Sequence, residues 1–371
     1  MPVLASADLR PFCRKGSIAW PGGSTPPAQR SREMRFTLEA GEARDVRRLC
    51  SELAARYETP ENPEFLAIAP VAAHELPRRL RLWLNDFRLN EPASAYGVLS
   101  GLPVDDEAIG DTPAHWKLQE MRRNVRVEEI ALVLTGSLLG ECIGWATQQD
   151  GHVVHDILPI KGLEHEQLGS GSEELLWWHI EDAFHECRGD YLGLMCLRNP
   201  DNVPTTFLSL RDVPLPAEVV GKLFEPHYTI RPDESHLKKN KPDPAQIVGD
   251  LAVSYEHIDQ MNTRPEKIPV LFGDPKAPYI RIDPYFMDPV EDPEAAAALK
   301  CLIDAVDERI YDLPLEPGEI LFVDNFQGVH GRKPFKARYD GKDRWFKRIN
   351  IARDLRRSRA MRERASDRVI H

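Results

Sequence analysis

Residues 175–185, "LLWWHIEDAFH", decide how the chain is interpreted, because an apolar run ends abruptly in acidic and imidazole side chains. Residues 175–178 have the composition of a short strand that is buried on both faces. His179 and Glu181 follow two residues apart, and in an extended chain such residues lie on the same face. This arrangement can bind a metal ion, although a plain surface turn could contain the same residues.

Bulk properties exclude several classes of protein. The 371 residues are 42% hydrophobic and 29% charged, with a formal net charge of −11, which is ordinary for a globular protein of one large or two smaller domains. The negative charge argues against a nucleic-acid partner. No apolar run reaches membrane-spanning length, and residues 1–30 lack the core of a signal peptide. The six cysteines contain no C-x-x-C pair. We therefore expect a cytoplasmic protein with free thiols.

The N-terminal part of the chain predicts a tail followed by helices. Residues 1–33, rich in Pro, Gly, Ser and Arg, predict a disordered tail, with Met34 as a second candidate start. Residues 34–371 are expected to form one domain, of which 34–147 is mainly helical. Helices are expected over residues 39–57, 75–89 and 127–146, and a strand within 95–106.

The rest of the chain predicts a β-rich core. Residues 148–354 consist mostly of short β-type runs separated by Pro, Gly, Asn and Asp, with one helix expected over 292–313. This pattern predicts a mainly β domain with packing helices, of the α+β class, with a jelly-roll or double-stranded β-helix core. Residues 231–244 are polar and proline-bounded, and predict a disordered loop or an active-site lid. Residues 355–371 form a basic C-terminal segment.

A second histidine strengthens the metal hypothesis. The H-x-[DE] triplet occurs twice, which is about what composition alone predicts. However, the strand expected at residues 320–323 runs into "DNFQGVHGRKPF", which contains His330, and Arg344 follows fourteen residues later. Two imidazoles and one carboxylate leave three open positions on an iron, as in non-haem Fe(II) oxygenases. A keto-acid cosubstrate with a second carboxylate then requires an arginine. We therefore favour a metal site over a structural His–Glu pair.

Five stretches carry a family resemblance: "HIEDAFHECRGDYLGLMCLRN", "PTTFLSL", "GDPKAPYIRIDPYFM", "NFQGVHGRKPF" and "DRWFKRINIARDL". Together they span much of residues 148–354, and they resemble the clavaminate-synthase-like Fe(II)/2-oxoglutarate dioxygenases, in particular the hydroxylases of free lysine, arginine and asparagine. The resemblance implies a jelly-roll oxygenase that uses Fe(II), 2-oxoglutarate and O₂. It also implies that a free L-amino acid is hydroxylated while succinate and CO₂ are released.

The resemblance assigns the metal and cosubstrate residues. It implies that His179, Glu181 and His330 hold iron, with Glu181 in place of the Asp that is commoner in wider relatives. It implies that Arg344 binds 2-oxoglutarate, assisted by a threonine of "PTT", which we take to be Thr206.

The resemblance also assigns residues that bind the amino acid. Arg348 would bind the substrate's α-carboxylate, since it shares the face of Arg344 in a strand. Glu181 would accept a hydrogen bond from the α-amine, and Gln148 and Ser170 would contact the amino acid backbone. A flexible turn is the structural alternative for Ser170, which lies in "LGSGSEE".

Asp283 carries the prediction of substrate. The arginine hydroxylases have two acids spaced by one residue here, whereas this chain has Asp283 and Tyr285. One carboxylate and one phenol suit a compact ammonium better than a guanidinium. We predict L-lysine, hydroxylated at C3 or C4, with arginine, citrulline or asparagine as alternatives. A turn Asp before a proline is the structural alternative.

Two other classes of protein also fit part of the pattern. A zinc hydrolase uses two His and a Glu, but the helical H-E-x-x-H motif is missing and no role remains for the two arginines. A non-catalytic β-sandwich binding module would account for the strands alone.

Overall fold

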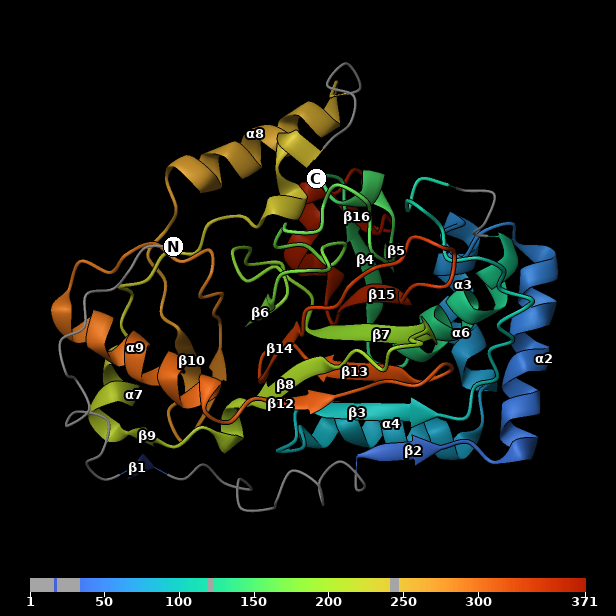
Figure 1. The fold of residues 1–371 in the computed structure, drawn as a ribbon, viewed down its shortest axis with the longest axis horizontal. Coiled ribbons are helices and arrows are strands. Elements are labelled where there is room, and N and C mark those ends of the chain that lie inside the picture. Colours follow the sequence, from blue (N-terminus) through green and yellow to red (C-terminus); the bar gives the residue numbers. More distant parts are fainter. Residues whose placement is uncertain (1–16, 19–33, 119–122, 241–246) are drawn as a thin grey trace.

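A computed structural model describes residues 17–18, 34–118, 123–240 and 247–371. Two mostly antiparallel sheets form the centre of the described chain (Figure 1). The larger sheet has the order β16 (Val369–Ile370), β4 (Glu141–Trp145), β15 (Trp345–Ala352), β7 (Tyr191–Arg198), β13 (Ile320–Asp324), β3 (Tyr96–Ser100) and β2 (Arg35–Thr37), with β5 (Val154–Ile157) also paired to β15. The smaller sheet has the order β12 (Tyr311–Leu313), β8 (Thr205–Ser209), β14 (Gly328–Arg332) and β6 (Leu176–His179).

N-terminal helices pack beside the larger sheet (Figure 1). They are α2 (Ala40–Arg56), α3 (Pro63–Ala72), α4 (Arg78–Asn90) and α6 (Arg126–Gly136). Their buried side chains join residues of β3, β7, β13 and β15 in one hydrophobic core. The helices predicted over 39–57 and 75–89 are confirmed, while α3 was not predicted.

The helix predicted over residues 127–146 was wrong in its second half. Helix α6 ends at Gly136, and β4 then pairs with β15. An apolar run suits a buried helix and a buried strand equally well, so periodicity could not separate them. The missed signal was Gly140 between the two elements, where a Cβ would lie 2.5 Å from the carbonyl oxygen of Ala352.

A second hydrophobic core lies beside the smaller sheet. It includes side chains of α7 (Ala217–Leu223), α8 (Asp250–Thr263), α9 (Pro293–Asp307) and the hairpin of β10 (Leu271–Asp274) and β11 (Ala277–Ile280). The helix predicted over 292–313 is confirmed as α9, which follows its N-cap Asp292, but its predicted end was wrong because Tyr311–Leu313 form β12. Helices α7 and α8 interrupt a region that we expected to be mostly β. Tyr228 and Ile230 form only isolated β-bridges, with Ile268 and Met287 respectively.

The described residues include only part of two segments predicted from the sequence, the tail at 1–33 and the lid at 231–244. Of residues 1–33, only Ser17–Ile18 (β1) are described, and they pair with β9 (Leu215–Pro216). The remainder of the predicted tail and residues 241–244 of the predicted lid lie outside the described residues. At the other end, β16 pairs in parallel with β4. The double-stranded β-helix winding stays a prediction.

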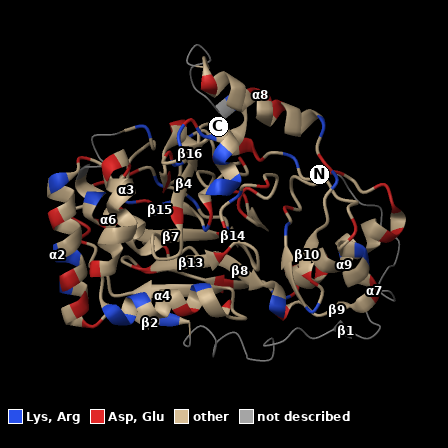
Figure 2. Cartoon of the chain, turned by 180° about the vertical axis from the view of Figure 1, so that it is seen from behind, with Lys and Arg blue, Asp and Glu red and all other residues tan. Residues whose placement is uncertain are grey.

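The surface carries both signs of charge. Figure 2 shows Lys and Arg interspersed with Asp and Glu along outer helices such as α2, while the central strands are mostly uncharged. Among the described residues, no helix has the length and apolar character needed to cross a membrane.

Candidate active site

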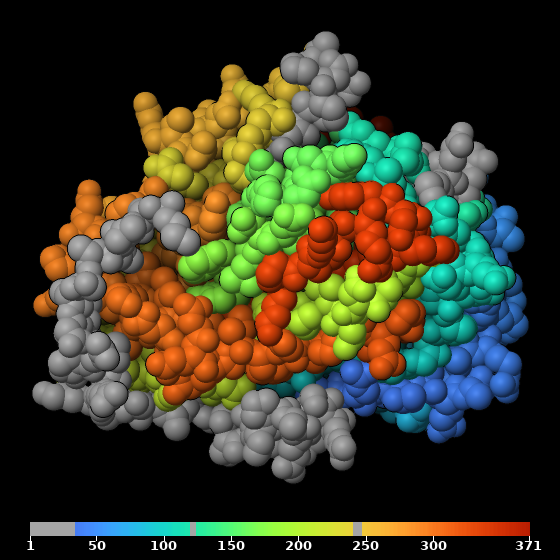
Figure 3. All heavy atoms as spheres, viewed as in Figure 1, coloured from blue at the N-terminus to red at the C-terminus, as the bar shows by residue number. Residues whose placement is uncertain are grey.

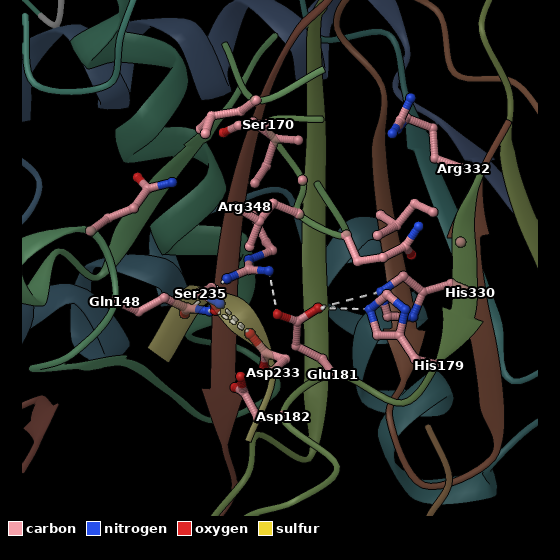
Figure 4. A pocket seen from close by; sticks show the side chains of 18 of the residues that line it. Gln148, Ser170, His179, Glu181, Asp182, Asp233, Ser235, His330, Arg332 and Arg348 are labelled. Atoms are coloured by element: carbon pink, nitrogen blue, oxygen red, sulfur yellow. Dashed lines mark hydrogen bonds and ion pairs between the residues drawn. The ribbon is translucent and has the colours of Figure 1, made fainter. Parts of the chain in front are cut away.

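The three predicted metal ligands come together between β6 and β14 (Figure 4). His179 and His330 are direct cross-strand partners, with ring centroids 4.7 Å apart. Glu181 lies just beyond β6, and its Oε2 is 3.6 Å from Nε2 of His179 and 3.5 Å from Nε2 of His330. One ligand atom from each residue lies within 4.8 Å of the others. This is a donor set that could hold a divalent metal ion.

Hydrogen bonds orient these side chains. Nδ1 of His179 donates to the carbonyl oxygen of Trp177 at 2.7 Å, which leaves Nε2 free to bind a metal. The backbone N–H of Glu181 donates to Asn325 Oδ1 at 2.9 Å, and Asn325 Nδ2 donates to the carbonyls of Glu181 and Gly189 at 3.0 and 2.9 Å. Sequence reasoning missed Asn325 as a positioning residue, although it lies in the turn before the second histidine.

Gly331 allows the two histidine-bearing strands to approach. A Cβ at this position would lie 2.5 Å from the carbonyl oxygen of Leu176, closer than any side chain tolerates. The pairing of β14 with β6 also contains a register shift beside His330. The glycine after the histidine is therefore required by backbone packing.

Electrostatics favour a cation between the three ligands. Burial alone would raise the pKa of Glu181, but Arg348 and both histidines hold that pKa well below its ordinary value. Burial lowers the pKa of His179, but Glu181 and Asp283 outweigh burial and raise it to about 9. Burial lowers the pKa of His330, which favours its neutral, metal-binding form. The ionised carboxylate of Glu181 thus faces one imidazole, His179, that attracts a proton, and a metal ion can replace that proton.

Arg344 could serve as an anion subsite in the same cavity, whose volume is about 200 Å³. The side chain is 4% exposed and borders the cavity just before β15. Its guanidinium stacks on Phe346 at 3.8 Å but has no hydrogen-bond or ion-pair partner among the described residues. Burial lowers the pKa of Arg344 to about 10. A buried, unpaired cation is costly, so this residue fits a bound carboxylate.

A second arginine and a threonine border the cavity with Arg344. Burial and the charge of Arg344 lower the pKa of Arg332 to about 9. Arg332 is the cross-strand partner of Thr205, and because side chains alternate, these two and His330 share one face. The Oγ1 of Thr205 is buried with no hydrogen-bond partner among the described residues. Thr205 therefore borders the cavity, whereas Thr206, the threonine that we predicted to assist Arg344, occupies the opposite face of the strand.

Two surface segments, the first of which contributes residues to the cavity lining, are joined by hydrogen bonds. Residues 160–175 (green) and 333–343 (red-orange) lie side by side in Figure 3. The N–H of Phe335 donates to the carbonyl oxygen of Ser172 at 2.8 Å, and the Tyr339 hydroxyl donates to Glu164 at 2.9 Å. Ser170 lies in the first segment and borders the cavity, and its carbonyl accepts from Ile160 at 3.1 Å. Ser170 therefore lies in a hydrogen-bonded turn.

Arg348 is held by three partners. It forms an ion pair with Glu181, and it donates to Gln148 Oε1 at 2.9 Å and to His155 Nδ1 at 2.8 Å. His155 is its cross-strand partner on β5 and donates through Nε2 to the carbonyl oxygen of His152. Burial and the charge of Arg348 hold the pKa of His155 far below its ordinary value, so this ring stays neutral and accepts. Sequence reasoning missed His155.

Two acids as well as the phenol, Asp233, Asp283 and Tyr285, are among the side chains that border the cavity. Asp283 accepts from the backbone N–H groups of Tyr285 and Phe286 at 3.2 and 3.4 Å. Burial raises the pKa of Asp283 to about 6, opposed by His179 and reinforced by Asp233. Asp233 belongs to the predicted lid and also borders the cavity, as does Tyr285, which is 51% exposed. The expected pairing of Asp283 with Tyr285 therefore omitted the second carboxylate.

Comparisons with known proteins agree with this site. The family described as "Taurine catabolism dioxygenase TauD, TfdA family" matches residues 123–350. The L-ornithine/L-arginine 3-hydroxylase of Catenulispora acidiphila is 46% identical over 91% of this chain and 99% of its own length. The enduracididine beta-hydroxylase of Streptomyces hygroscopicus is 45% identical over 87% of this chain and 95% of its own length. The L-lysine 4-hydroxylase of Chitinophaga pinensis is 29% identical over 77% and 72%.

Solved structures support the same conclusion. The non-heme iron oxygenase OrfP, in complex with Fe, succinate and (3S)-hydroxy-L-Arg, matches with a TM-score of 0.85 and 44% identity, over 91% of this chain and 99% of that chain. Another OrfP structure contains Fe and alpha-ketoglutaric acid. These matches exclude the zinc hydrolase and the non-catalytic β-sandwich. The chain belongs to the TauD/TfdA family of dioxygenases, as an Fe(II)/2-oxoglutarate-dependent hydroxylase of amino acids.

Proposed function

We propose that the enzyme hydroxylates C3 of free L-arginine, with L-ornithine as a second substrate. The observation that carries this proposal is the pair of acids, Asp233 and Asp283, bordering the cavity. Two carboxylates suit the several N–H donors of a guanidinium better than they suit a single ammonium. The predicted preference for lysine rested on there being one acid.

The relatives support the same choice. Those at 45–46% identity bear names that specify ornithine, arginine or enduracididine and position 3 or β, whereas the lysine enzyme is 29% identical. Further OrfP structures contain L-canavanine and L-homoarginine, which resemble arginine in their side chains.

The ion pair between Arg348 and Glu181 supports a free amino acid as substrate. A zwitterion carries a carboxylate and an ammonium on one carbon, so it can satisfy both members of this pair. We assign the α-carboxylate to Arg348 and Gln148, and the α-amine to Glu181. A substrate in a peptide lacks one of the two charges.

We assign the cosubstrate and iron to the remaining groups. Arg344, with Thr205, would bind the far carboxylate of 2-oxoglutarate, and His179, Glu181 and His330 would hold Fe(II). Iron, when bound, supplies the activation of O₂ that couples the oxidation of 2-oxoglutarate to substrate hydroxylation. The protein fixes the substrate carbon and excludes water. We propose that its core is a double-stranded β-helix and that the described part of the predicted lid, residues 231–240, covers the substrate.

A substrate panel tests the proposal. L-arginine, ornithine, lysine, citrulline and asparagine are incubated with enzyme, Fe(II), 2-oxoglutarate and O₂, and succinate and hydroxylated product are measured. We expect the highest kcat/KM for arginine. A preference for citrulline or asparagine would overturn the assignment of the two acids, and a preference for lysine would restore the sequence-based prediction.

A further inference from the structure

Behind the wall of the cavity, a buried histidine joins residues 231–240 to the rest of the site. His236 lies at the end of the 3-10 helix η6 (Glu234–His236), and its side chain is 0% exposed. Its Nδ1 lies 2.8 Å from Thr147 Oγ1, and its Nε2 lies 3.1 Å from Asp182 Oδ1. One imidazole therefore connects three segments that are distant in the sequence.

One contact of His236 runs beside a contact that borders the cavity. Ser235 accepts a hydrogen bond from Gln148 Nε2 at 2.6 Å, and both residues border the cavity (Figure 4). Directly behind this bond, His236, which follows Ser235, forms a hydrogen bond with Thr147, which precedes Gln148. The two segments are thus joined by two adjacent hydrogen bonds.

A second contact of His236 reaches the residue after a proposed iron ligand, and Nε2 of His236 also lies 3.8 Å from Asp233 Oδ2. Asp182 follows Glu181, and its backbone has a φ of +52°, which non-glycine residues seldom adopt. Its Oδ2 accepts from Trp145 Nε1 at 2.6 Å and from Asn350 Nδ2 at 3.0 Å. These bonds hold Asp182 without help from His236, so Asp182 is a fixed anchor for the segment.

We infer that His236 is a positioning residue, which holds residues 231–240 on the anchor Asp182 and thereby presents Asp233 to the side chain of the substrate. Asp233 is the N-cap of η6, and its Oδ1 accepts from the N–H of Ser235 at 2.8 Å. The acid and the histidine therefore belong to one short rigid unit. The role of Asp233 rests on the proposed function, whereas the anchoring by His236 does not.

Two conservative variants separate the contact of His236 with Thr147 from its contact with Asp182. His236→Gln places an amide nitrogen near the position of Nε2 and retains the bond to Asp182. His236→Asn reaches only the position of Nδ1 and leaves Asp182 Oδ1 without this donor. We expect His236→Asn to raise the KM for arginine by about tenfold or more, as expected when a hydrogen bond to a charged group is lost. The KM for 2-oxoglutarate should stay within about twofold, and His236→Gln should restore the KM for arginine.

Trypsin provides a readout that does not depend on turnover. The side chains of Lys238 and Lys239 are 46% and 50% exposed, so release of the segment should accelerate cleavage after them. Lys276, in the exposed turn between β10 and β11, is the control. We expect faster cleavage after Lys238 and Lys239 in His236→Asn, with unchanged cleavage after Lys276 and wild-type cleavage in His236→Gln.

The outcomes distinguish the anchor from the substrate assignment. Equal acceleration at all three lysines would indicate global destabilisation and overturn the inference, as would unchanged cleavage in His236→Asn. If cleavage after Lys238 and Lys239 is selectively faster but the enzyme prefers a neutral amino acid, the anchoring role of His236 is supported. The role of Asp233 and the proposed function are then overturned.

Discussion

His179 and His330 face each other directly across β6 and β14, so a single cross-strand pairing forms the imidazole half of the proposed iron site. Glu181, two residues beyond the strand position of His179, completes the set from the same segment. The geometry of the site therefore depends on the register of two strands in the smaller sheet.

Removing either imidazole should abolish turnover. In His179→Ala or His330→Ala, one of three iron ligands is lost while the β6–β14 backbone pairing remains. We expect kcat to fall by at least about a thousandfold, comparable to the loss of other essential catalytic groups. Anaerobic addition of Fe(II) and 2-oxoglutarate should no longer give the visible band of chelated keto acid. His165→Ala, at a histidine whose side chain is 70% exposed, is the control. Normal activity in either cavity variant would refute the iron assignment.

Arg344→Met should weaken the binding of 2-oxoglutarate and stabilise the protein in the absence of this cosubstrate. The guanidinium is buried without a partner among the described residues, so its removal relieves a desolvation cost in the empty cavity. We expect the Kd for 2-oxoglutarate, titrated by the visible band, to rise by about a hundredfold, and Tm without cosubstrate to increase. Arg188→Met removes another buried arginine, one that stacks on Phe326 outside this cavity. An equal loss of affinity in Arg188→Met would contradict the assignment.

The pH dependence of kcat/KM should report Asp283. Burial raises the pKa of Asp283 to about 6, so the carboxylate takes up a proton as the pH falls through that value and no longer attracts a cationic side chain. We expect kcat/KM for arginine to fall below about pH 6, and Asp283→Asn to lower it by about two orders of magnitude at pH 8.

Asp324 is the matched control for Asp283. Burial raises its pKa to about 6 as well, but it lies outside the cavity. A carboxyl whose folded pKa exceeds 3.8 stabilises the fold at low pH, and this contribution is lost as the pH rises through about 6. Asp283→Asn and Asp324→Asn should each therefore stabilise the substrate-free protein above pH 6, by up to about 3 kcal/mol. Only the Asp283 variant should lose activity, and loss in both would implicate folding instead.

Asn325→Ala should damage the site through the backbone of Glu181. The Asn325 side chain satisfies three buried backbone groups, two on Glu181 and one on Gly189. Leaving such groups unpaired costs about 1–3 kcal/mol each. We expect a lower Tm together with a weaker affinity for Fe(II), measured by equilibrium dialysis. A lower Tm with unchanged affinity would show that Asn325 stabilises the fold without positioning the ligand.

The sequence could predict the secondary-structure elements that are specified by their own residues and near neighbours. The helices over residues 39–57 and 75–89 have regular apolar spacing and were confirmed, and the helix predicted over 292–313 was confirmed as far as Asp307. The proposed ligands His179, Glu181 and His330 could be predicted together because a family resemblance supplied the long-range pairing that spacing alone does not give.

The sequence could not predict features that depend on the alternation of side chains along a strand or on contacts between distant residues. Thr205 and Thr206 are identical in type, and only the β8–β14 register shows which one faces the cavity. Asp233 lies about fifty residues before Asp283 in the chain, so the second acid of the cavity had no signal in the motif around Asp283. His155 likewise depends on the pairing of β5 with β15.

The pairing of His179 with His330 also bears on the lifetime of the protein. The two strands are about 150 residues apart in the chain, and closing a loop of that length costs roughly 4 kcal/mol in chain entropy. An ion bound to both imidazoles acts as a removable cross-link between distant parts of the chain, and it stabilises the folded state by mass action. Scarcity of iron would then accelerate unfolding and degradation of this protein, so that the metal supply sets the amount of enzyme as well as its rate.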